Sequence, residues 1–127
     1  MSGTVEQWHK VAQARDPAGL DALLAEDAVF FSPVVHAPQR GKALTAKYLA
    51  AALEVLGGSN FRYVEQWVGP RSAALEFAAV IDGIEVEGVD IIGWNAEGRI
   101  ERFKVMIRPL KAIEVVRQKM AAALTGP

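Results

Sequence analysis

The sequence of 127 residues contains no cysteine and only two histidines, His9 and His36. The absence of cysteine excludes disulfide bonds, thiolate metal sites and a thiol nucleophile. The two histidines do not occur in an HxH or HExxH spacing, so the sequence gives no signal for a metal site, and we expect no cofactor. A phosphate-binding loop is not expected either, because no GxxxxGK(S/T) motif follows a predicted strand.

The sequence also lacks a marked excess of charge of either sign, and it lacks long hydrophobic runs. The chain carries 14 basic and 15 acidic residues, for a net charge of −1, so we expect neither nucleic-acid binding nor attachment to an anionic membrane surface. No stretch reaches the roughly 18 consecutive apolar residues of a membrane-spanning helix. The first ten residues include Glu6 and do not resemble a signal peptide. A cytoplasmic protein is the expectation.

What remains is the composition of an ordinary globular protein, with 51% hydrophobic and 23% charged residues. A chain of this length is typical of one domain and is long enough to bury a substantial core. The sequence shows no repeat, no low-complexity segment and no linker. We therefore expect a single domain over residues 1–127.

The first half of the chain is predicted to contain three helices and one strand. The helices are expected at residues 4–15, 16–27 and 41–58, and the strand at residues 28–33. The second helix begins with Asp16, a good N-cap residue, and Pro17, which suits the first helical position. The apolar residues of the long third helix are predicted to lie on one face: Leu44, Tyr48, Ala52 and Val55.

After Gly58 the apolar residues alternate with polar ones, as is typical of strands. Four strands are predicted, at residues 60–69, 72–81, 84–94 and 99–108. A last helix follows Pro109, with these residues on one side: Leu110, Ile113, Val116 and Met120. Helices that follow and precede a run of antiparallel strands predict an α+β domain, with the helices on one face of a curved antiparallel sheet.

The register of the central hairpin places Asp90 inside. Asp82-Gly83 between two apolar runs is a strong signal for a two-residue turn, which pairs Ile81 with Ile84. Because side chains alternate between faces, Asp90 is the one carboxylate on an otherwise apolar face of these two strands. That face comprises Leu75, Phe77, Ala79, Ile84, Val86, Gly88, Ile92 and Trp94, and the last strand adds Phe103, Val105 and Ile107.

The opposite face of the predicted sheet mixes apolar residues with charges of both signs. Because the helices are expected to cover the other face, this one would be left open, and an open face of this kind is a plausible interface between two copies of the chain. We therefore expect a homodimer through these residues: Glu76, Ala78, Val80, Glu85, Glu87, Val89, Ile91, Ile100, Arg102, Lys104 and Met106.

The element order and three segments of the sequence resemble a known family. The segments are "DALLAEDAVFFSP", "RGKALTAKYL" and "GVDIIGWNAEGRIERFKVMIRP". Together they resemble the SnoaL-like and ketosteroid isomerase-like family of the nuclear transport factor two-like superfamily, over nearly the whole chain. The resemblance implies a cone-shaped cystatin-like fold, in which a curved antiparallel sheet wraps around helices and encloses a deep pocket, with an added C-terminal helix. Many such proteins bind apolar small molecules, and several catalyse isomerisation, cyclisation, dehydration or epoxide opening.

The resemblance also implies roles for single residues. Asp90 matches the strand aspartate that, in ketosteroid isomerases, stays protonated and donates a hydrogen bond to the substrate oxyanion. Ser32 stands where those isomerases have their aspartate base, and Trp8 where they have a tyrosine. Two of three catalytic groups therefore differ, and we expect no efficient steroid isomerisation. Tyr48 matches a pocket aromatic of the long helix. With Trp8 and Ser32, the expected substrate-binding residues are Tyr48, Phe77 and Phe103.

His36 lies in "FFSPVVHAPQRG", on a loop at the expected mouth of the pocket. A histidine titrates near neutral pH, so His36 is a candidate general base, with Asp90 as the acid. Each residue also has a plainer interpretation. His36 could be a surface histidine of the loop, and His9 is expected to face solvent. Asp90 could be structural, although a buried carboxylate has to be hydrogen-bonded or protonated.

Three hypotheses for function follow. The first is an acid–base enzyme of the isomerase, cyclase or dehydratase type, which acts on a carbonyl-bearing hydrophobic substrate through Asp90, with His36 or Tyr48 as its partner. The second is a non-catalytic pocket for an apolar small molecule. The third is a protein whose open sheet face serves assembly. Burial of Asp90 without a cationic partner on the same face should raise its pKa. The absence of the family's base and tyrosine at Ser32 and Trp8 favours the second hypothesis over an isomerase.

Overall fold

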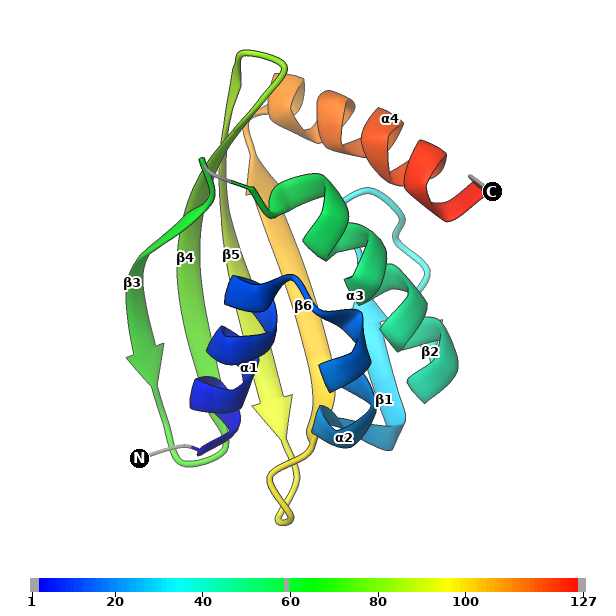
Figure 1. The fold of residues 1–127 in the computed structure, drawn as a ribbon, viewed down its shortest axis with the longest axis vertical. Helices are drawn as coiled ribbons and strands as arrows, with labels where there is room; N and C mark the ends of the chain where they lie inside the picture. Colours follow the sequence, from blue (N-terminus) through cyan, green and yellow to red (C-terminus); the bar gives the residue numbers. More distant parts are fainter. Residues whose placement is uncertain (1–2, 59, 126–127) are drawn as a thin grey trace.

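The computed structural model describes residues 3–58 and 60–125 of the chain (Figure 1). Within these residues there are four α-helices, a 3₁₀ turn and six strands. The helices are α1 (Gly3–Ala14), α2 (Leu20–Leu23), α3 (Lys42–Leu56) and α4 (Leu110–Thr125), and the turn η1 is Pro17–Gly19. The strands are β1 (Leu24–Phe31), β2 (Gln39–Arg40), β3 (Arg62–Val68), β4 (Ser72–Ile81), β5 (Ile84–Trp94) and β6 (Ile100–Arg108).

The six strands form one sheet in the order β2-β1-β6-β5-β4-β3. The predicted α+β class is confirmed, but the sheet is mixed, because β1 pairs with β6 in parallel while the other neighbours are antiparallel. Parallel pairing requires a long connection, and α3 together with the β3–β5 strands supplies it here. The short strand β2 had no signal in the sequence.

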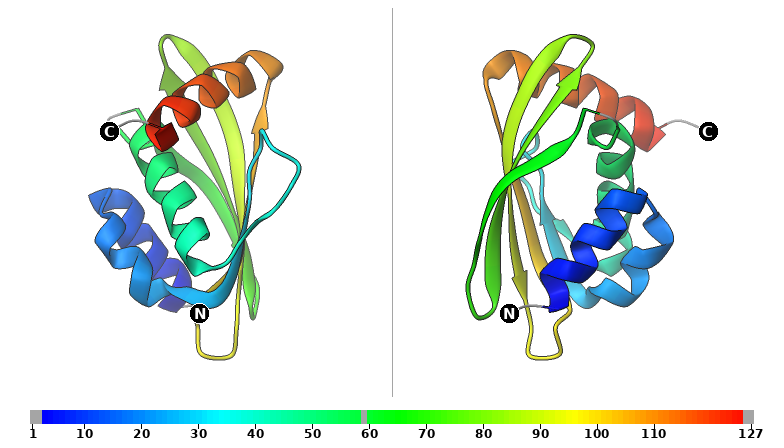
Figure 2. Two further views of the ribbon diagram at one scale, coloured as in Figure 1. Left: turned by 90° about the vertical axis from the view of Figure 1, so that its right-hand side faces the viewer. Right: turned by 60° about the vertical axis from the view of Figure 1, so that its left-hand side comes forward.

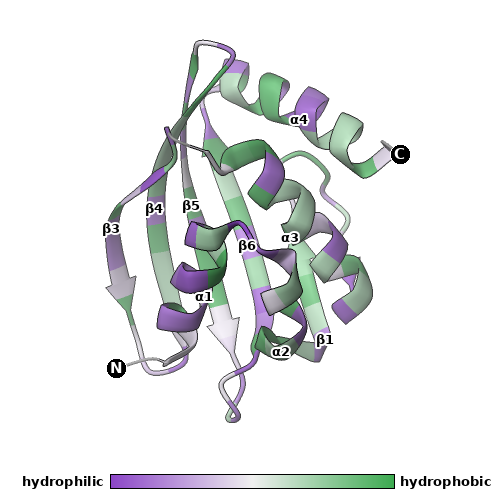
Figure 3. Cartoon of the chain, viewed as in Figure 1, coloured by the Kyte–Doolittle hydropathy of each residue, from purple (hydrophilic) through white to green (hydrophobic). Residues whose placement is uncertain are grey.

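The helices gather on one side of the curved sheet. Figure 2 shows α1, α2, α3 and α4 on that side, with the other face of the sheet left without helices. Figure 3 shows hydrophobic residues along α3 and along the strands behind it, which is the arrangement expected of a core between the two layers. The core therefore lies between the helices and the inward face of the sheet.

The predicted register of the central strands is confirmed. Ile81 pairs with Ile84 across the turn, and Asp90 lies between Leu75 of β4 and Val105 of β6. The positive φ angles of Asp82 (50°) and Gly83 (77°) fit a two-residue hairpin turn. The predicted inward face is buried throughout, apart from partly buried Ile84 and Ile107 at its end.

The predicted apolar face of the long helix was wrong by about one residue position. The fully buried residues of α3 are Thr45, Leu49, Ala51 and Leu53, whereas Leu44, Tyr48, Ala52 and Val55 are only partly buried. The polar Thr45 is buried because its hydroxyl donates a hydrogen bond to the carbonyl oxygen of Ala28, 3.1 Å away in β1. Side-chain hydrogen bonding to the sheet, as well as apolar spacing, thus fixes how α3 faces the core.

Three further expectations need correction. Leu110, placed on the buried side of the last helix, is 76% exposed; Val116 is buried as predicted, together with Ala112 and Val115, which were not named. Ile100, assigned to the outer face, is fully buried, because a register shift beside Gly93 pairs Ile100 with Trp94. The predicted helix at residues 16–27 is only η1 and α2, and β1 begins at Leu24.

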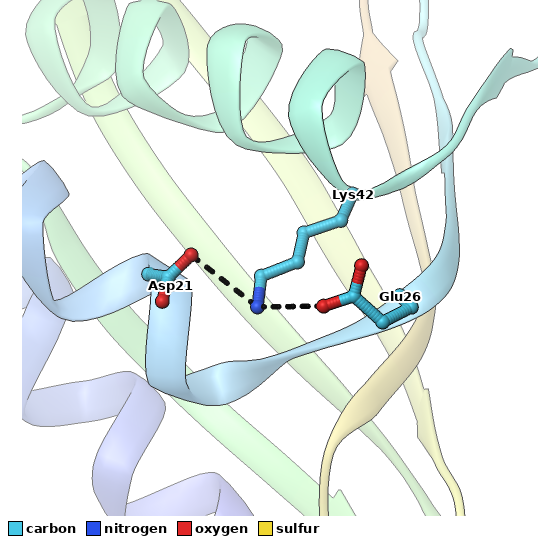
Figure 4. Close-up of polar contacts among 3 residues, drawn as sticks. All are labelled: Asp21, Glu26 and Lys42. Carbon is cyan, nitrogen blue, oxygen red and sulfur yellow. Dashed lines mark hydrogen bonds and ion pairs between the residues drawn. The ribbon is translucent and has the colours of Figure 1, made fainter.

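Lys42, at the beginning of α3, forms ion pairs with two of the elements that precede it. Its ammonium nitrogen lies 3.3 Å from Asp21 Oδ1 in α2 and 3.3 Å from Glu26 Oε2 in β1 (Figure 4). Both carboxylates are largely exposed, so each pair stabilises the fold by at most about 1 kcal/mol. The two contacts link the beginning of α3 to α2 and to β1.

Gly88 gives Phe77 room to lie flat on the sheet. A Cβ atom at Gly88 would lie 2.3 Å from Phe77 Cζ and 2.7 Å from the carbonyl oxygen of Met106, distances that no side chain tolerates. The two residues are cross-strand partners. The fully buried Phe77 ring can therefore form part of the inward surface next to Asp90.

Candidate functional site

Asp90 ends a chain of hydrogen bonds that crosses three elements. Tyr63 of β3 donates from its hydroxyl to Asp90 Oδ2 of β5 at 2.6 Å. The same hydroxyl accepts a hydrogen bond from Trp8 Nε1 of α1 at 2.8 Å. Trp8 is 3% and Asp90 5% exposed. A carboxylate in the middle of an apolar strand is thus satisfied by a tyrosine that is itself held by a tryptophan.

The direction of this chain is fixed by chemistry. An indole N–H can only donate, so the tyrosine hydroxyl accepts from Trp8 and uses its own proton toward Asp90. Among the described residues, no hydrogen bond reaches the second carboxyl oxygen, Oδ1, and no fully buried side-chain oxygen or nitrogen lacks a partner. Oδ1 is therefore the atom of Asp90 that meets the adjoining cavity.

Burial changes the acid–base properties of both groups. Desolvation raises the pKa of Asp90 to about 7, and the hydrogen bond from Tyr63 opposes part of that rise. Desolvation and the nearby charge of Asp90 raise the pKa of Tyr63 well above its usual value, against the lowering effect of the hydrogen bond from Trp8. Tyr63 therefore stays neutral, while Asp90 exchanges its proton near neutral pH.

A small cavity, here called the inner cavity, lies beside Asp90. Its volume is about 40 Å³. Since a water molecule occupies roughly 30 Å³ in the liquid, this space holds one water or the tip of a ligand rather than a whole apolar molecule. Apart from Asp90, Tyr63 and Trp8, its walls are apolar: Ala12, Leu49, Ala52, Leu53, Leu56, Gly57, Phe61, Phe77, Phe103 and Val105.

A larger open cleft, here called the outer cleft, adjoins the inner cavity. Its volume is about 380 Å³. The two spaces are neighbours because they share four wall residues: Ala12, Gly57, Phe61 and Tyr63. The remaining walls of the outer cleft are polar or small: His9, Gln13, Arg15, Gly58 and Arg62. The site thus has a narrow apolar end at Asp90 and a wide polar end between α1, the end of α3 and β3.

The structure brings together four of the seven residues expected in the site. Asp90, Trp8, Phe77 and Phe103 all line the inner cavity. The ring of Trp8 packs edge-on against Phe103, with ring centroids 4.8 Å apart. Tyr48 is not part of this cavity, and its partly buried ring instead lies 5.7 Å from the ring of Phe30.

Ser32 and His36 lie elsewhere. The hydroxyl of Ser32 accepts a hydrogen bond from the backbone N–H of Val34 at 3.0 Å, which stabilises the loop after β1. The side chain of His36 is exposed, and both residues line a separate surface cleft beside β6. The structure therefore does not bring His36 together with Asp90.

Two residues of the site were missed in the sequence. Tyr63 pairs with Phe77, which pairs with Gly88, so extending the strand alternation by one more strand would have placed Tyr63 inward. His9, expected to face solvent, is partly buried and lines the outer cleft. Its ring lies edge-on to Tyr63 with centroids 5.0 Å apart, and its Nε2 lies 2.8 Å from Gln66 Oε1.

Neither a metal cluster nor a membrane helix is found in the described part of the chain. No group of three histidine, aspartate or glutamate side chains among residues 3–58 and 60–125 could hold a metal ion. No helix in the same residues is long and apolar enough to cross a membrane.

A family model and several solved structures match this chain, and the matches agree with one another. Residues 5–103 match the model of the SnoaL-like domain. No match was found among curated proteins. A steroid delta-isomerase from Pseudomonas aeruginosa is 36% identical and superposes with a TM-score of 0.90, over 95% of this chain and 88% of that one.

Two further solved structures are similar. An uncharacterised protein with a cystatin-like fold from Silicibacter pomeroyi is 32% identical, with a TM-score of 0.89 over 96% of this chain and 85% of that one. A hypothetical protein with a ketosteroid isomerase-like fold from Catenulispora acidiphila, in complex with trimethylamine, is 14% identical. Its TM-score is 0.65 over 89% of this chain and 91% of that one, a likeness of fold alone. These matches confirm the cystatin-like fold.

The raised pKa of Asp90 makes stability depend on pH. The folded protein keeps this proton up to about pH 7, whereas the unfolded chain loses it near pH 3.8. Between these values the folded state binds more protons, so the free energy of unfolding falls as pH rises from about 4 to 7 and levels off above, by a total on the order of 4 kcal/mol. Urea unfolding at about pH 5 and 8 should show more than half of this loss in the wild type and none of it in Asp90→Asn; parallel profiles for the two proteins would contradict it.

Proposed function

Because this chain belongs to the SnoaL-like family, we propose that it binds a carbonyl-bearing apolar small molecule with its oxygen against Asp90. The observation that carries the proposal is the chain Trp8–Tyr63–Asp90, which ends at the wall of the inner cavity. Protonated Asp90 donates a hydrogen bond from Oδ1 to the ligand oxygen. The inner cavity takes the carbonyl end, and the outer cleft takes the rest of the molecule.

The same arrangement supports acid–base catalysis of the isomerase, cyclase or dehydratase type. In such reactions negative charge develops on a carbonyl or hydroxyl oxygen of the substrate. A hydrogen bond from Asp90 in a water-poor cavity strengthens as that charge develops, so it stabilises the transition state more than the ground state. Tyr63 keeps Oδ2 in place and thereby directs the proton on Oδ1 toward the substrate.

A catalytic role also requires a group that accepts a proton, and His9 is the best-placed candidate. It lines the outer cleft and packs against the ring of Tyr63. If Gln66 Oε1 accepts a hydrogen bond from Nε2–H, as their 2.8 Å separation supports, Nδ1 is left as a free base. His36 does not fit this role, because it lines a different cleft.

Efficient isomerisation of steroids is not part of the proposal, although one relative bears the name of a steroid delta-isomerase. Among the described residues, Asp90 is the only carboxylate that lines the inner cavity or the outer cleft, so no second carboxylate is available as the base. A non-catalytic ligand-binding protein is therefore the second candidate. Both candidates require the hydrogen bond from Asp90 to a ligand oxygen.

A matched pair of ligands tests that hydrogen bond: 2-acetylnaphthalene, which has a ketone, and 2-ethylnaphthalene, which lacks it. The ratio of their dissociation constants, measured by calorimetry, reports the preference for the ketone. One neutral hydrogen bond gives a preference of about 3- to 10-fold. In the wild type this preference should disappear as pH rises through about 7 and Asp90 loses its proton.

Variants at position 90 distinguish the effect of the titrating proton on ligand preference from the effect of cavity shape. In Asp90→Asn the amide N–H still donates but cannot titrate, so the preference should persist at all pH values. In Asp90→Leu it should be absent at all pH values. The control is Asp27→Asn, an exposed aspartate of β1, which should behave as the wild type. A ketone preference that survives in Asp90→Leu would refute the proposed role.

We further propose that the chain forms a homodimer through the outer face of the sheet. Trp67, Val80 and Met106 are 54%, 41% and 48% exposed on this face. Apolar exposure of this extent favours an interface between two copies.

Light scattering at micromolar concentration should give about twice the mass of 13.7 kDa. The double change Trp67→Glu and Met106→Glu should give monomers, and Leu110→Glu, at an exposed position of α4, should not; a monomeric wild type would refute the dimer.

A further inference from the structure

We propose that the inner cavity selects aldehydes and methyl ketones, that is, carbonyl compounds in which only one of the two groups on the carbonyl carbon is large. The inference rests on the proposed function, because it concerns the molecule whose oxygen meets Asp90. The oxygen and the small group would occupy the inner cavity. The large apolar group would extend past Ala12 and Phe61 into the outer cleft.

The volume of the inner cavity sets the size limit. This volume is about 40 Å³, next to about 380 Å³ in the outer cleft. A closed apolar cavity of about 150 Å³ holds one benzene ring, so on the same scale the inner cavity holds one or two non-hydrogen atoms. The oxygen and the methyl carbon of a methyl ketone meet this limit. A ring or a branched chain in place of the methyl group exceeds it.

The sheet side of the inner cavity is closed by aromatic rings that support one another. Phe77 is fully buried and stacks on Phe61, with ring centroids 5.3 Å apart. Phe103 is 1% exposed, and its ring centroid lies 4.8 Å from that of Trp8 and 6.2 Å from that of Phe30. Enlarging the cavity on this side would displace several buried rings together, which a close-packed interior resists.

The helix side of the inner cavity is formed by α3. Leu49 and Leu53, one helical turn apart, line the inner cavity, and neither lines the outer cleft. They are 1% and 8% exposed. Ala52 lines the same cavity with a much smaller side chain. The lengths of the side chains at positions 52 and 53 therefore determine how large a group fits beside Asp90.

The passage between the two spaces suits the large group of the ligand. Ala12, Gly57, Phe61 and Tyr63 line both spaces, so two small residues and two aromatic rings surround the passage. The rings of Phe61 and Tyr63 lie edge-on, with centroids 5.0 Å apart. A flat apolar body packs well against aromatic rings. Because this body leaves the inner cavity through the passage, the limit of 40 Å³ does not apply to it.

The test compares two matched pairs of naphthalene compounds. The methyl pair is 2-acetylnaphthalene and 2-ethylnaphthalene, and the isopropyl pair is 2-isobutyrylnaphthalene and 2-isobutylnaphthalene. Within each pair a CH₂ group replaces the carbonyl group, so the ratio of the two dissociation constants, measured by calorimetry, reports the hydrogen bond from Asp90. The ratio between the two ketones reports the size limit.

We expect the wild type, at about pH 6 where Asp90 keeps its proton, to distinguish the two pairs. The ketone preference should be about 3- to 10-fold in the methyl pair and absent in the isopropyl pair. The isopropyl ketone should also bind about 10-fold or more weakly than the methyl ketone, although it is the more hydrophobic of the two, because its branched group does not fit.

A variant in α3 tests which residue sets the limit. Leu53→Ala removes side-chain volume beside the inner cavity, so it should restore the ketone preference of the isopropyl pair and bring the affinities of the two ketones to within about 3-fold of each other. Leu20→Ala, at a buried leucine that lines neither space, is the matched control and should keep the selectivity of the wild type. Circular dichroism shows whether both variants are folded.

Ala52→Val makes the opposite change and removes no core packing. The two added methyl groups should fill the inner cavity and abolish the ketone preference of the methyl pair. Ala50→Val, the same change at a partly buried position of α3 that does not line the inner cavity, is the control and should keep that preference. This pair of variants tests the size limit even if Leu53→Ala does not fold.

Equal affinities and equal ketone preferences for the two pairs in the wild type would overturn the size limit and leave the role of Asp90 standing. An unchanged ketone preference of the methyl pair in Ala52→Val would also overturn it, as would a folded Leu53→Ala that still rejects the isopropyl ketone. Loss of the ketone preference even in the methyl pair of the wild type would instead refute the proposed function on which the inference rests.

Discussion

The buried carboxyl group of Asp90 is the constraint on which the rest of the site depends. Leaving a charge in an apolar sheet without a partner is costly, so the fold has to neutralise or solvate it. Among the described residues it supplies a single neutral donor, Tyr63, and no cation, which leaves protonation as the second means of lowering the cost. Trp8 in turn requires Tyr63, because the N–H of Trp8 would otherwise be buried without an acceptor. One chain of hydrogen bonds thereby links α1 to the buried carboxyl group in β5.

Much of the sheet could be predicted because one turn fixes its register. Asp82-Gly83 sets the pairing of β4 with β5, and alternation then places Phe77, Asp90 and Phe103 on the inward face without further information. The same logic failed at Ile100, because a register shift is not visible in the alternation of the sequence. It was not carried to β3, and Tyr63 was missed for that reason.

Helix faces and loops were harder to predict, for physical reasons. Several elements surround α3, so apolar residues occur on more than one side of it, and spacing alone does not select the buried one. The direction of Thr45 is decided by a carbonyl oxygen in β1, which is a tertiary contact. His36 and Ser32 lie on a loop whose path is set by local hydrogen bonds such as that from Val34, so their sequence distance from the strands says little about the pocket. The two spaces of the site, one apolar and one polar, are formed by contacts between α1, α3 and β3, which the sequence pattern of a single element does not show.

The direct test of this account is the titration of the Asp90 carboxyl carbon by carbon NMR, with the resonance assigned by its loss in Asp90→Asn. We expect a midpoint at about pH 7 for the wild type. In Tyr63→Phe the midpoint should be higher, because the hydrogen bond that favours the carboxylate is gone. A wild-type midpoint near pH 4, the ordinary value for an exposed aspartate, would contradict the central claim.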